Sequence, residues 1–144
     1  MEGLRYARSF EELIVYRKAS AVAGRVFDLS KSFPKEEAYS LTDQVRRASR
    51  SIGAQIAEAW GKRRFPRHFV SKLTDADAEH LETRHWIRVA TACGYVTAEQ
   101  ERDLVGELAE IGRMLHGMIR KAKVFCDPLD PVVGDEAAEY FANV

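Results

Sequence analysis

Apolar residues recur at alternating steps of three and four along four segments of this 144-residue chain. Such spacing places them on one face of an α-helix, where they form a stripe that must be buried. The first stripe comprises Val15, Ala19, Val22, Val26, Leu29 and Phe33, and the second comprises Leu41, Val45, Ala48, Ile52, Ile56 and Ala59. The third, which includes polar residues, comprises Phe69, Leu73, Ala76, His80, Thr83, Ile87 and Ala90. The pattern is clearest in the fourth, through Leu104, Leu108, Ile111, Leu115, Met118, Ala122 and Phe125. No segment shows the sustained apolar and polar alternation that is typical of a strand. The spacing therefore predicts an all-α protein.

The limits of the helices follow from cap and turn signals. Ser9 with Glu12, and Thr97 with Gln100, have the spacing of a capping box, and Ser40 is a suitable N-cap. Gly61 and Gly94 mark the ends of the second and third helices. The predicted helices cover residues 10–33, 40–63, 66–93 and 97–125.

Only a few residues connect each helix to the next, so neighbouring helices must run antiparallel. The economical arrangement is an up-down-up-down antiparallel four-helix bundle. Residues 1–126 are predicted to form this single domain. Residues 127–144 form an acidic C-terminal tail that has room for one short helix.

Composition excludes several classes of protein. The chain has 22 Lys and Arg against 22 Asp and Glu, so no attraction of the whole molecule to nucleic acid or to acidic membranes is expected. Its apolar runs are far shorter than the roughly 18 residues that span a bilayer, so no membrane partner is predicted. The start lacks an export signal, and Cys93 and Cys126 are interpreted as reduced, buried thiols, which indicates a cytoplasmic protein.

Charge is nevertheless segregated along the chain. Residues 44–72 hold eight Lys or Arg and one acid, whereas residues 127–144 hold five acids and no Lys or Arg. A phosphate backbone requires several cations on one surface. The candidate nucleic-acid-binding residues are Arg46, Arg47, Arg50, Lys62, Arg63, Arg64 and Arg67.

Two interpretations of this basic segment stay open. Trp60, Phe65 and Phe69 lie among the cations and could stack unpaired bases of RNA or DNA. Alternatively, the aromatic side chains are buried and the cations pair with acids. The acids considered are Glu58, Glu79 and Glu82.

The segment 66–93 raises a second hypothesis, a small metal-dependent enzyme. Glu82 and His85 form a Glu-x-x-His unit, the ligand pair of di-iron bundles, but the sequence has no second unit. His80 and Thr83 fall on the buried stripe and are predicted to be structural. Motifs of nucleophilic, phosphate-binding or redox enzymes are also absent from the sequence. We therefore expect no catalytic residues, no metal site and no cofactor.

Several short runs resemble the four-helix-bundle family of 23S ribosomal RNA intervening-sequence proteins. They are Ser9 to Leu13, Lys18-Ala19, Phe33 to Glu37, Gln44 to Ala48, Ser51-Ile52, Ile56 to Glu58 and Gly94 to Val96. The resemblance implies a left-handed bundle that assembles as a homopentameric ring without known catalytic activity. A relative, the accessory variability determinant of diversity-generating retroelements, binds nucleic acid and its reverse transcriptase through a basic surface.

The leading hypothesis is thus a non-enzymatic oligomeric adaptor or assembly protein, with RNA or DNA and a protein as candidate partners. The resemblance implies that the oligomer is a pentamer, and apolar residues outside the main stripes independently favour a homo-oligomer. These residues are Tyr16, Ala23 and Phe27 in the first helix, and Val70, Leu81 and Trp86 in the third.

Overall fold

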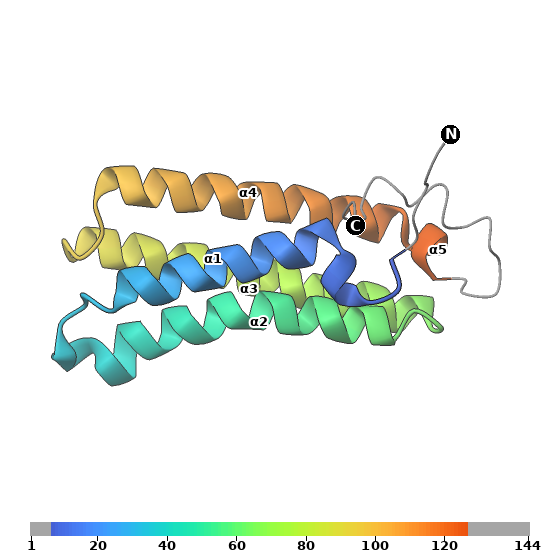
Figure 1. Cartoon of the computed structure of the whole chain (residues 1–144), viewed down its shortest axis with the longest axis horizontal. Coiled ribbons are helices and arrows are strands. Elements are labelled where there is room, and N and C mark those ends of the chain that lie inside the picture. The colour runs from blue at the N-terminus through green and yellow to red at the C-terminus, as the bar shows by residue number, and fades with distance from the viewer. Residues whose placement is uncertain (1–6, 127–144) are drawn as a thin grey trace.

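Four long helices form an elongated bundle, shown by a computed structural model that describes residues 7–126 (Figure 1). They are α1 (Ile14–Ser30), α2 (Asp43–Gly61), α3 (Pro66–Ala92) and α4 (Ala98–Arg120), followed by the short helix α5 (Ala122–Phe125). Each long helix runs antiparallel to the next, and α4 returns to lie beside α1. No strand occurs among the described residues. The predicted up-down-up-down fold is confirmed.

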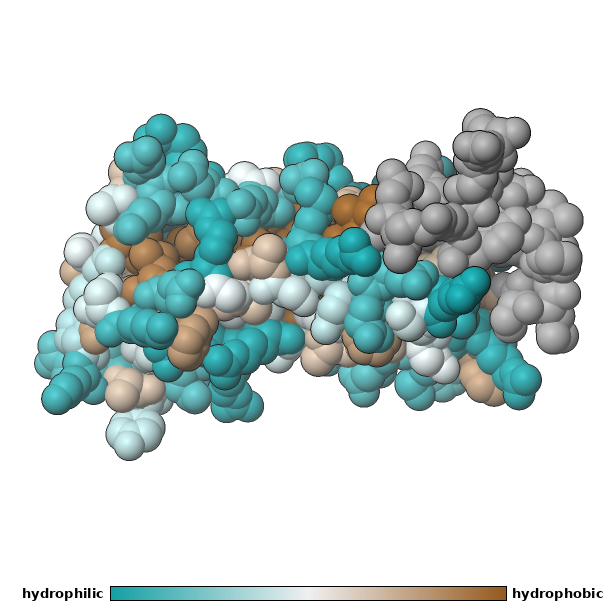
Figure 2. Space-filling model, viewed as in Figure 1, coloured by the Kyte–Doolittle hydropathy of each residue, from teal (hydrophilic) through white to brown (hydrophobic). Residues whose placement is uncertain are grey.

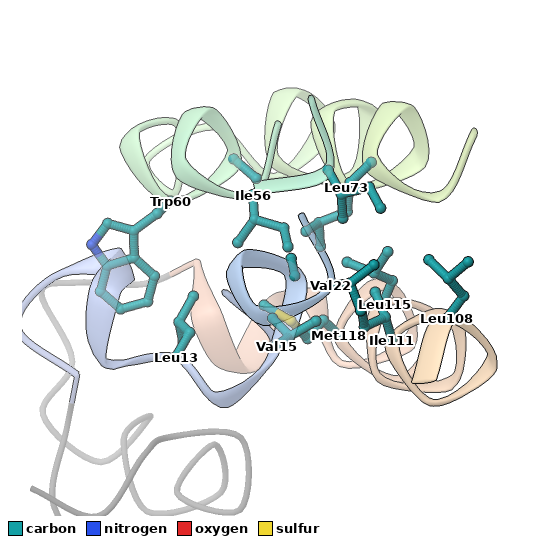
Figure 3. Close-up of a cluster of buried hydrophobic side chains, with 14 of the residues drawn as sticks. Leu13, Val15, Val22, Ile56, Trp60, Leu73, Leu108, Ile111, Leu115 and Met118 are labelled. Atoms are coloured by element: carbon teal, nitrogen blue, oxygen red, sulfur yellow. The ribbon is translucent and has the colours of Figure 1, made fainter. Parts of the chain in front are cut away.

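The predicted stripes line the interior. All the stripe residues of α2, α3 and α4 are buried, and Figure 3 shows side chains from all four long helices pointing into one shared core. In α1 the stripe is buried up to Val26, whereas Leu29 and Phe33 are half-buried. No described helix combines the length and the apolar composition needed to cross a membrane.

Two polar residues of α3 lie inside this core, as predicted. The Thr83 hydroxyl donates to the backbone carbonyl of Glu79 at 2.8 Å. His80 is 6% exposed, and its Nδ1 lies 2.8 Å from the carbonyl oxygen of Asp77. Each side chain therefore has a hydrogen-bond partner within its own helix, which makes its burial tolerable.

The predicted first and second helices begin differently from expectation. A 3₁₀ turn (Phe10–Glu12) is followed by extended Leu13, and α1 starts only at Ile14. The Ser9 side chain makes no cap hydrogen bond, and the Glu12 carboxylate accepts from the Arg8 amide instead. The predicted capping box at Ser9 is therefore wrong.

Ser40 is likewise not an N-cap. A 3₁₀ turn (Lys35–Glu37) and a π-helical turn (Ala38–Thr42) run directly into α2. The Ser40 hydroxyl lies within the π-helical turn and donates to the Glu37 carboxylate at 2.7 Å. Because these turns continue into the α-helix, there is no free helix terminus at Ser40 to cap.

The later cap signals are confirmed. Thr97 and Gln100 form both hydrogen bonds of a capping box at the start of α4. Gly94 has φ +81°, and the amides of Gly94 and Tyr95 donate to carbonyls in the last turn of α3. This is a Schellman motif, and the positive φ explains the glycine.

The last predicted helix is interrupted near its end. α4 ends at Arg120, and the chain continues as α5, so residues 97–125 are two helices rather than one. Residues 127–144 lie outside the described part of the chain, and so does the short helix expected there.

The contact between His80 and Gly112 yields a prediction about stability. A Cβ atom built on Gly112 would lie 2.9 Å from the His80 ring. We expect Gly112→Ala to lower the free energy of unfolding by up to about 2 kcal/mol, because shifting the His80 ring, which is held at Nδ1 by Asp77, costs about 1–3 kcal/mol and the better helix propensity of alanine offsets only about 0.5–1 kcal/mol. Urea denaturation followed by circular dichroism measures this change.

Gly106 in the same helix serves as a control. A Cβ atom added to Gly106 would have no neighbouring atom within 4 Å. Gly106→Ala should therefore raise stability by about 0.5–1 kcal/mol. Equal effects of the two substitutions would contradict the packing argument.

Candidate nucleic-acid interface

The seven candidate cations occupy two separate parts of the bundle. Arg46, Arg47 and Arg50, here called the helix cluster, lie in the first half of α2. Lys62, Arg63, Arg64 and Arg67, here called the basic corner, surround the α2–α3 connection. A rise of 1.5 Å per residue separates Arg50 from Lys62 by about 18 Å along α2. The structure therefore does not bring the seven residues into one continuous surface.

Arg46 joins α2 to α1. Its Nε donates to the Ser30 hydroxyl at 2.7 Å, and its guanidinium lies 4.7 Å from the centre of the Phe27 ring. Arg50 lies over the same ring at 5.5 Å. Sequence reasoning missed Phe27 and Ser30 as partners, because they are distant in sequence and no local signal identifies them.

Arg47 is the exposed member of the helix cluster. Its side chain is 73% exposed and lies 3.8 Å from the Asp43 carboxylate one turn earlier. The pKa of Glu79 is raised mainly by burial and then by Glu82, and nearby Arg47 opposes this effect. Of the acids considered as partners, Glu58 pairs with Lys72 at 3.7 Å.

The α2–α3 connection, which carries three cations of the basic corner, ends at Pro66, the first residue of α3, and Arg67 lies in the first turn of α3. Within it Arg63 has a structural role. Its Nε donates to the Trp60 carbonyl at 3.0 Å, and its guanidinium lies 3.5 Å from the centre of the Trp60 ring. Burial lowers the pKa of Arg63.

The other three cations of the corner face solvent. Arg64 and Arg67 are exposed and Lys62 is half-exposed. Within residues 7–126, none of them lies within 4.0 Å of a carboxylate.

The three aromatic residues considered for base stacking also divide into buried and exposed members. Trp60 and Phe69 belong to the core, and Phe69 stacks on Phe125 of α5 with ring centres 5.9 Å apart. Phe65 is 57% exposed and has an edge contact with His68 at 5.7 Å. Only Phe65 therefore presents a ring on which a base could stack.

Cys126 follows α5 at this same end of the bundle (Figure 1). It is buried as predicted, whereas Cys93, which follows the last turn of α3, is exposed, so the predicted burial of Cys93 is wrong. Burial raises the pKa of the Cys126 thiol to about 11, although the neighbouring Arg63 guanidinium opposes the shift. The thiol is consequently protonated near neutral pH and is a poor nucleophile or metal ligand.

The Glu-x-x-His unit of α3 has other partners. Trp86 Nε1 donates to Glu82 at 3.3 Å, and the His85 ring packs edge-on against the Trp86 ring at 4.8 Å. The Asp77 carboxylate lies 3.1 Å from both His80 and His116. Across residues 7–126, no three His, Cys, Asp or Glu side chains are placed to hold a metal ion.

A cleft of about 480 Å³ lies between the end of α1 and the start of α4. Figure 2 shows apolar surface between these helices, at the end of the bundle remote from α5. Arg25 and Glu107 form an ion pair between α1 and α4. Ser32 lies on the cleft wall, and its hydroxyl donates to the Leu29 carbonyl. The hydroxyl is therefore not hydrogen-bonded to a side chain that could act as a general base. The cleft offers no arrangement for nucleophilic catalysis.

These contacts predict different effects for two adjacent arginines. Arg46→Ala should lower the free energy of unfolding by about 1–2 kcal/mol, because a hydrogen bond and a cation–π contact are lost. Arg47→Ala should change it by less than about 0.5 kcal/mol, as expected for an exposed ion pair. Thermal and urea denaturation of both variants would measure the difference, and equal losses would contradict the anchoring role of Arg46.

Comparisons with known proteins agree with this architecture. Residues 11–117 match the sequence profile of the family described as 23S rRNA-intervening sequence protein. A crystal structure from the S23 ribosomal protein family of Bacteroides thetaiotaomicron, a protein of unknown function, is similar with a TM-score of 0.67 and 29% identity. The similarity covers 74% of this chain and 99% of that one. A comparison with curated proteins gives no match. The chain belongs to the family of 23S rRNA-intervening sequence proteins.

Proposed function

We propose that the protein is a non-enzymatic, homo-oligomeric adaptor that binds single-stranded RNA or DNA at the basic corner. The observation that carries this proposal is the exposed Phe65 ring beside Lys62, Arg64 and Arg67. None of these three cations is paired with a carboxylate within the described residues. A surface of this composition suits a ligand that carries both phosphates and flat aromatic bases.

Each part of the corner has a distinct role in this proposal. Arg64 and Arg67 contact phosphates, and Lys62 adds a third positive charge. Phe65 stacks on a base, which needs an unpaired strand because paired bases hide their faces. Arg63 holds the connection against Trp60 and so positions its neighbours.

The family supports a nucleic-acid partner without identifying it. Its name refers to 23S rRNA, and the resemblance to the retroelement accessory protein implies binding of nucleic acid and of a protein partner. The helix cluster takes a smaller part in the proposed interface, because Arg46 is committed to the α1–α2 contact. No observation favours the alternative of a metal-dependent enzyme.

The resemblance also supports assembly into a homopentamer. Four of the six apolar residues outside the stripes already have neighbours within the chain: Tyr16, Val70 and Trp86 pack against the core, and Phe27 lies beneath two arginines. Leu81 of α3 remains 51% exposed. We infer that Leu81 contributes to the contact between subunits, since burying it would remove apolar surface from water.

Salt dependence tests the role of the basic corner. For single strands, the logarithm of affinity falls by about 0.7 per neutralised phosphate for each tenfold rise in salt. Arg64→Ala/Arg67→Ala should therefore reduce that slope by about 1.4 for an oligouridine strand. Fluorescence anisotropy between about 50 and 300 mM salt, set in the range where such binding weakens, measures the slope.

Two further variants separate the effect of the corner's charges from that of charges elsewhere and from that of base stacking. Arg102→Ala/Arg113→Ala removes two exposed charges from α4 and should leave the slope unchanged. Phe65→Ala should weaken binding by about 1–3 kcal/mol at every salt concentration, because it removes stacking rather than charge. If Arg102→Ala/Arg113→Ala reduced the salt dependence of the affinity as much as Arg64→Ala/Arg67→Ala does, binding would not be located at the corner.

Light scattering tests assembly. The wild-type protein should give a single species of about five chain masses. Leu81→Asp should give smaller species while the helical circular dichroism signal stays unchanged, because a charge would be buried at the interface. A wild-type mass of one chain would refute the oligomer, and an unaffected assembly of Leu81→Asp would exclude Leu81 from the contact.

A further inference from the structure

The described chain ends next to the basic corner. Phe125 stacks on Phe69, which lies in the first turn of α3, and Cys126 is close enough to Arg63 for the two groups to interact electrostatically. Figure 1 shows α5 and the α2–α3 connection at the same end of the bundle. The chain therefore reaches residue 126 beside the corner's cations.

The sequence that starts there has the opposite charge. Between Ala59 and Thr74 the chain carries five Lys or Arg and no acid, whereas residues 127–144 carry five acids and no Lys or Arg. The acids of this segment are Asp127, Asp130, Asp135, Glu136 and Glu139. The two segments are complementary in charge, and the acidic one is tethered to the bundle beside the basic one.

We propose that the acidic segment 127–144 binds the basic corner of its own chain. Two arguments favour this segment as the ligand of the corner: its charge is opposite to that of the corner, and it is covalently attached beside it. Lys62, Arg64 and Arg67 have no carboxylate partner among residues 7–126, and an intramolecular ligand is present at an effective concentration near millimolar. Eighteen residues reach at most about 60 Å, so the length of the segment does not limit the contact.

Binding of this kind is weak and sensitive to salt. Exposed ion pairs are screened over about 10 Å at 0.1 M salt and contribute at most about 1 kcal/mol each, so the proposed contact weakens as salt rises. The segment occupies the same cations that phosphate would use. A consequence, which rests on the proposed function, is that the segment competes with nucleic acid and shifts binding toward ligands with many phosphates.

Carbodiimide crosslinking tests the contact without any nucleic acid. The reagent joins a lysine amine to a carboxylate that touches it. We expect crosslinks between Lys62 and the acids of residues 127–144 at low salt, with at least about a fivefold loss in 0.5 M salt, where charges are screened within a few ångströms. Lys35, in the α1–α2 connection at the other end of the bundle, is the matched control.

Several results would overturn the proposal. They are the absence of a Lys62 crosslink, an equal yield at Lys35, or crosslinks that occur only in covalent dimers. The last result would assign the contact to a second copy of the chain.

Nucleic-acid binding tests the competition separately. Asp135→Asn/Glu136→Gln/Glu139→Gln should raise affinity for an oligouridine strand about threefold at 50 mM salt, with little effect at 300 mM. Glu36→Gln/Glu99→Gln/Asp103→Asn changes the net charge equally at exposed positions outside the acidic segment and should have a smaller effect. Equal effects would refute competition, whereas no binding by any variant would refute the proposed function and leave the crosslinking result to decide the contact.

Discussion

The burial of the α3 stripe between α2 and α4 is the constraint on which the rest of the bundle depends. α3 makes the two most extensive helix contacts of the structure, and its seven stripe residues are all buried. Two of them, His80 and Thr83, are polar. Their hydrogen bonds to backbone carbonyls of the preceding turn allow α3 to stay central, and the absence of a side chain at Gly112 gives the His80 ring its space.

Much of the fold could be predicted because burial follows helical periodicity. The stripes of α2, α3 and α4 needed only the spacing of apolar residues, and the turn at Gly94 needed only a residue that accepts positive φ. The start of α1 could not be predicted in this way. Leu13 is 1% exposed, and its burial coincides with extended backbone, so a core contact rather than the local Ser9 signal decides where the helix begins.

The candidate site was less predictable for a related reason. Composition located the cations, but their roles depend on partners that only the fold supplies. Arg46 contacts Ser30 and Phe27 of α1, and Arg63 lies over the Trp60 ring. Arg64 and Arg67 have no such partner among the described residues, because they emerge where the chain reverses direction and no neighbouring helix covers them. A charge count therefore predicts a basic segment, whereas the topology divides it into a scaffold part and an exposed part.

This division has a physical consequence for recognition. A cation that is already engaged by a hydroxyl and an aromatic ring gains little from a phosphate, since it would have to give up existing contacts. A solvated cation beside an exposed ring gains both charge neutralisation and stacking. The corner is also held in place from two sides, by Arg63 against Trp60 and by Phe69 against Phe125. In the proposed interface, a nucleic-acid ligand would therefore order exposed side chains, whereas the connection that carries them is already ordered by these contacts.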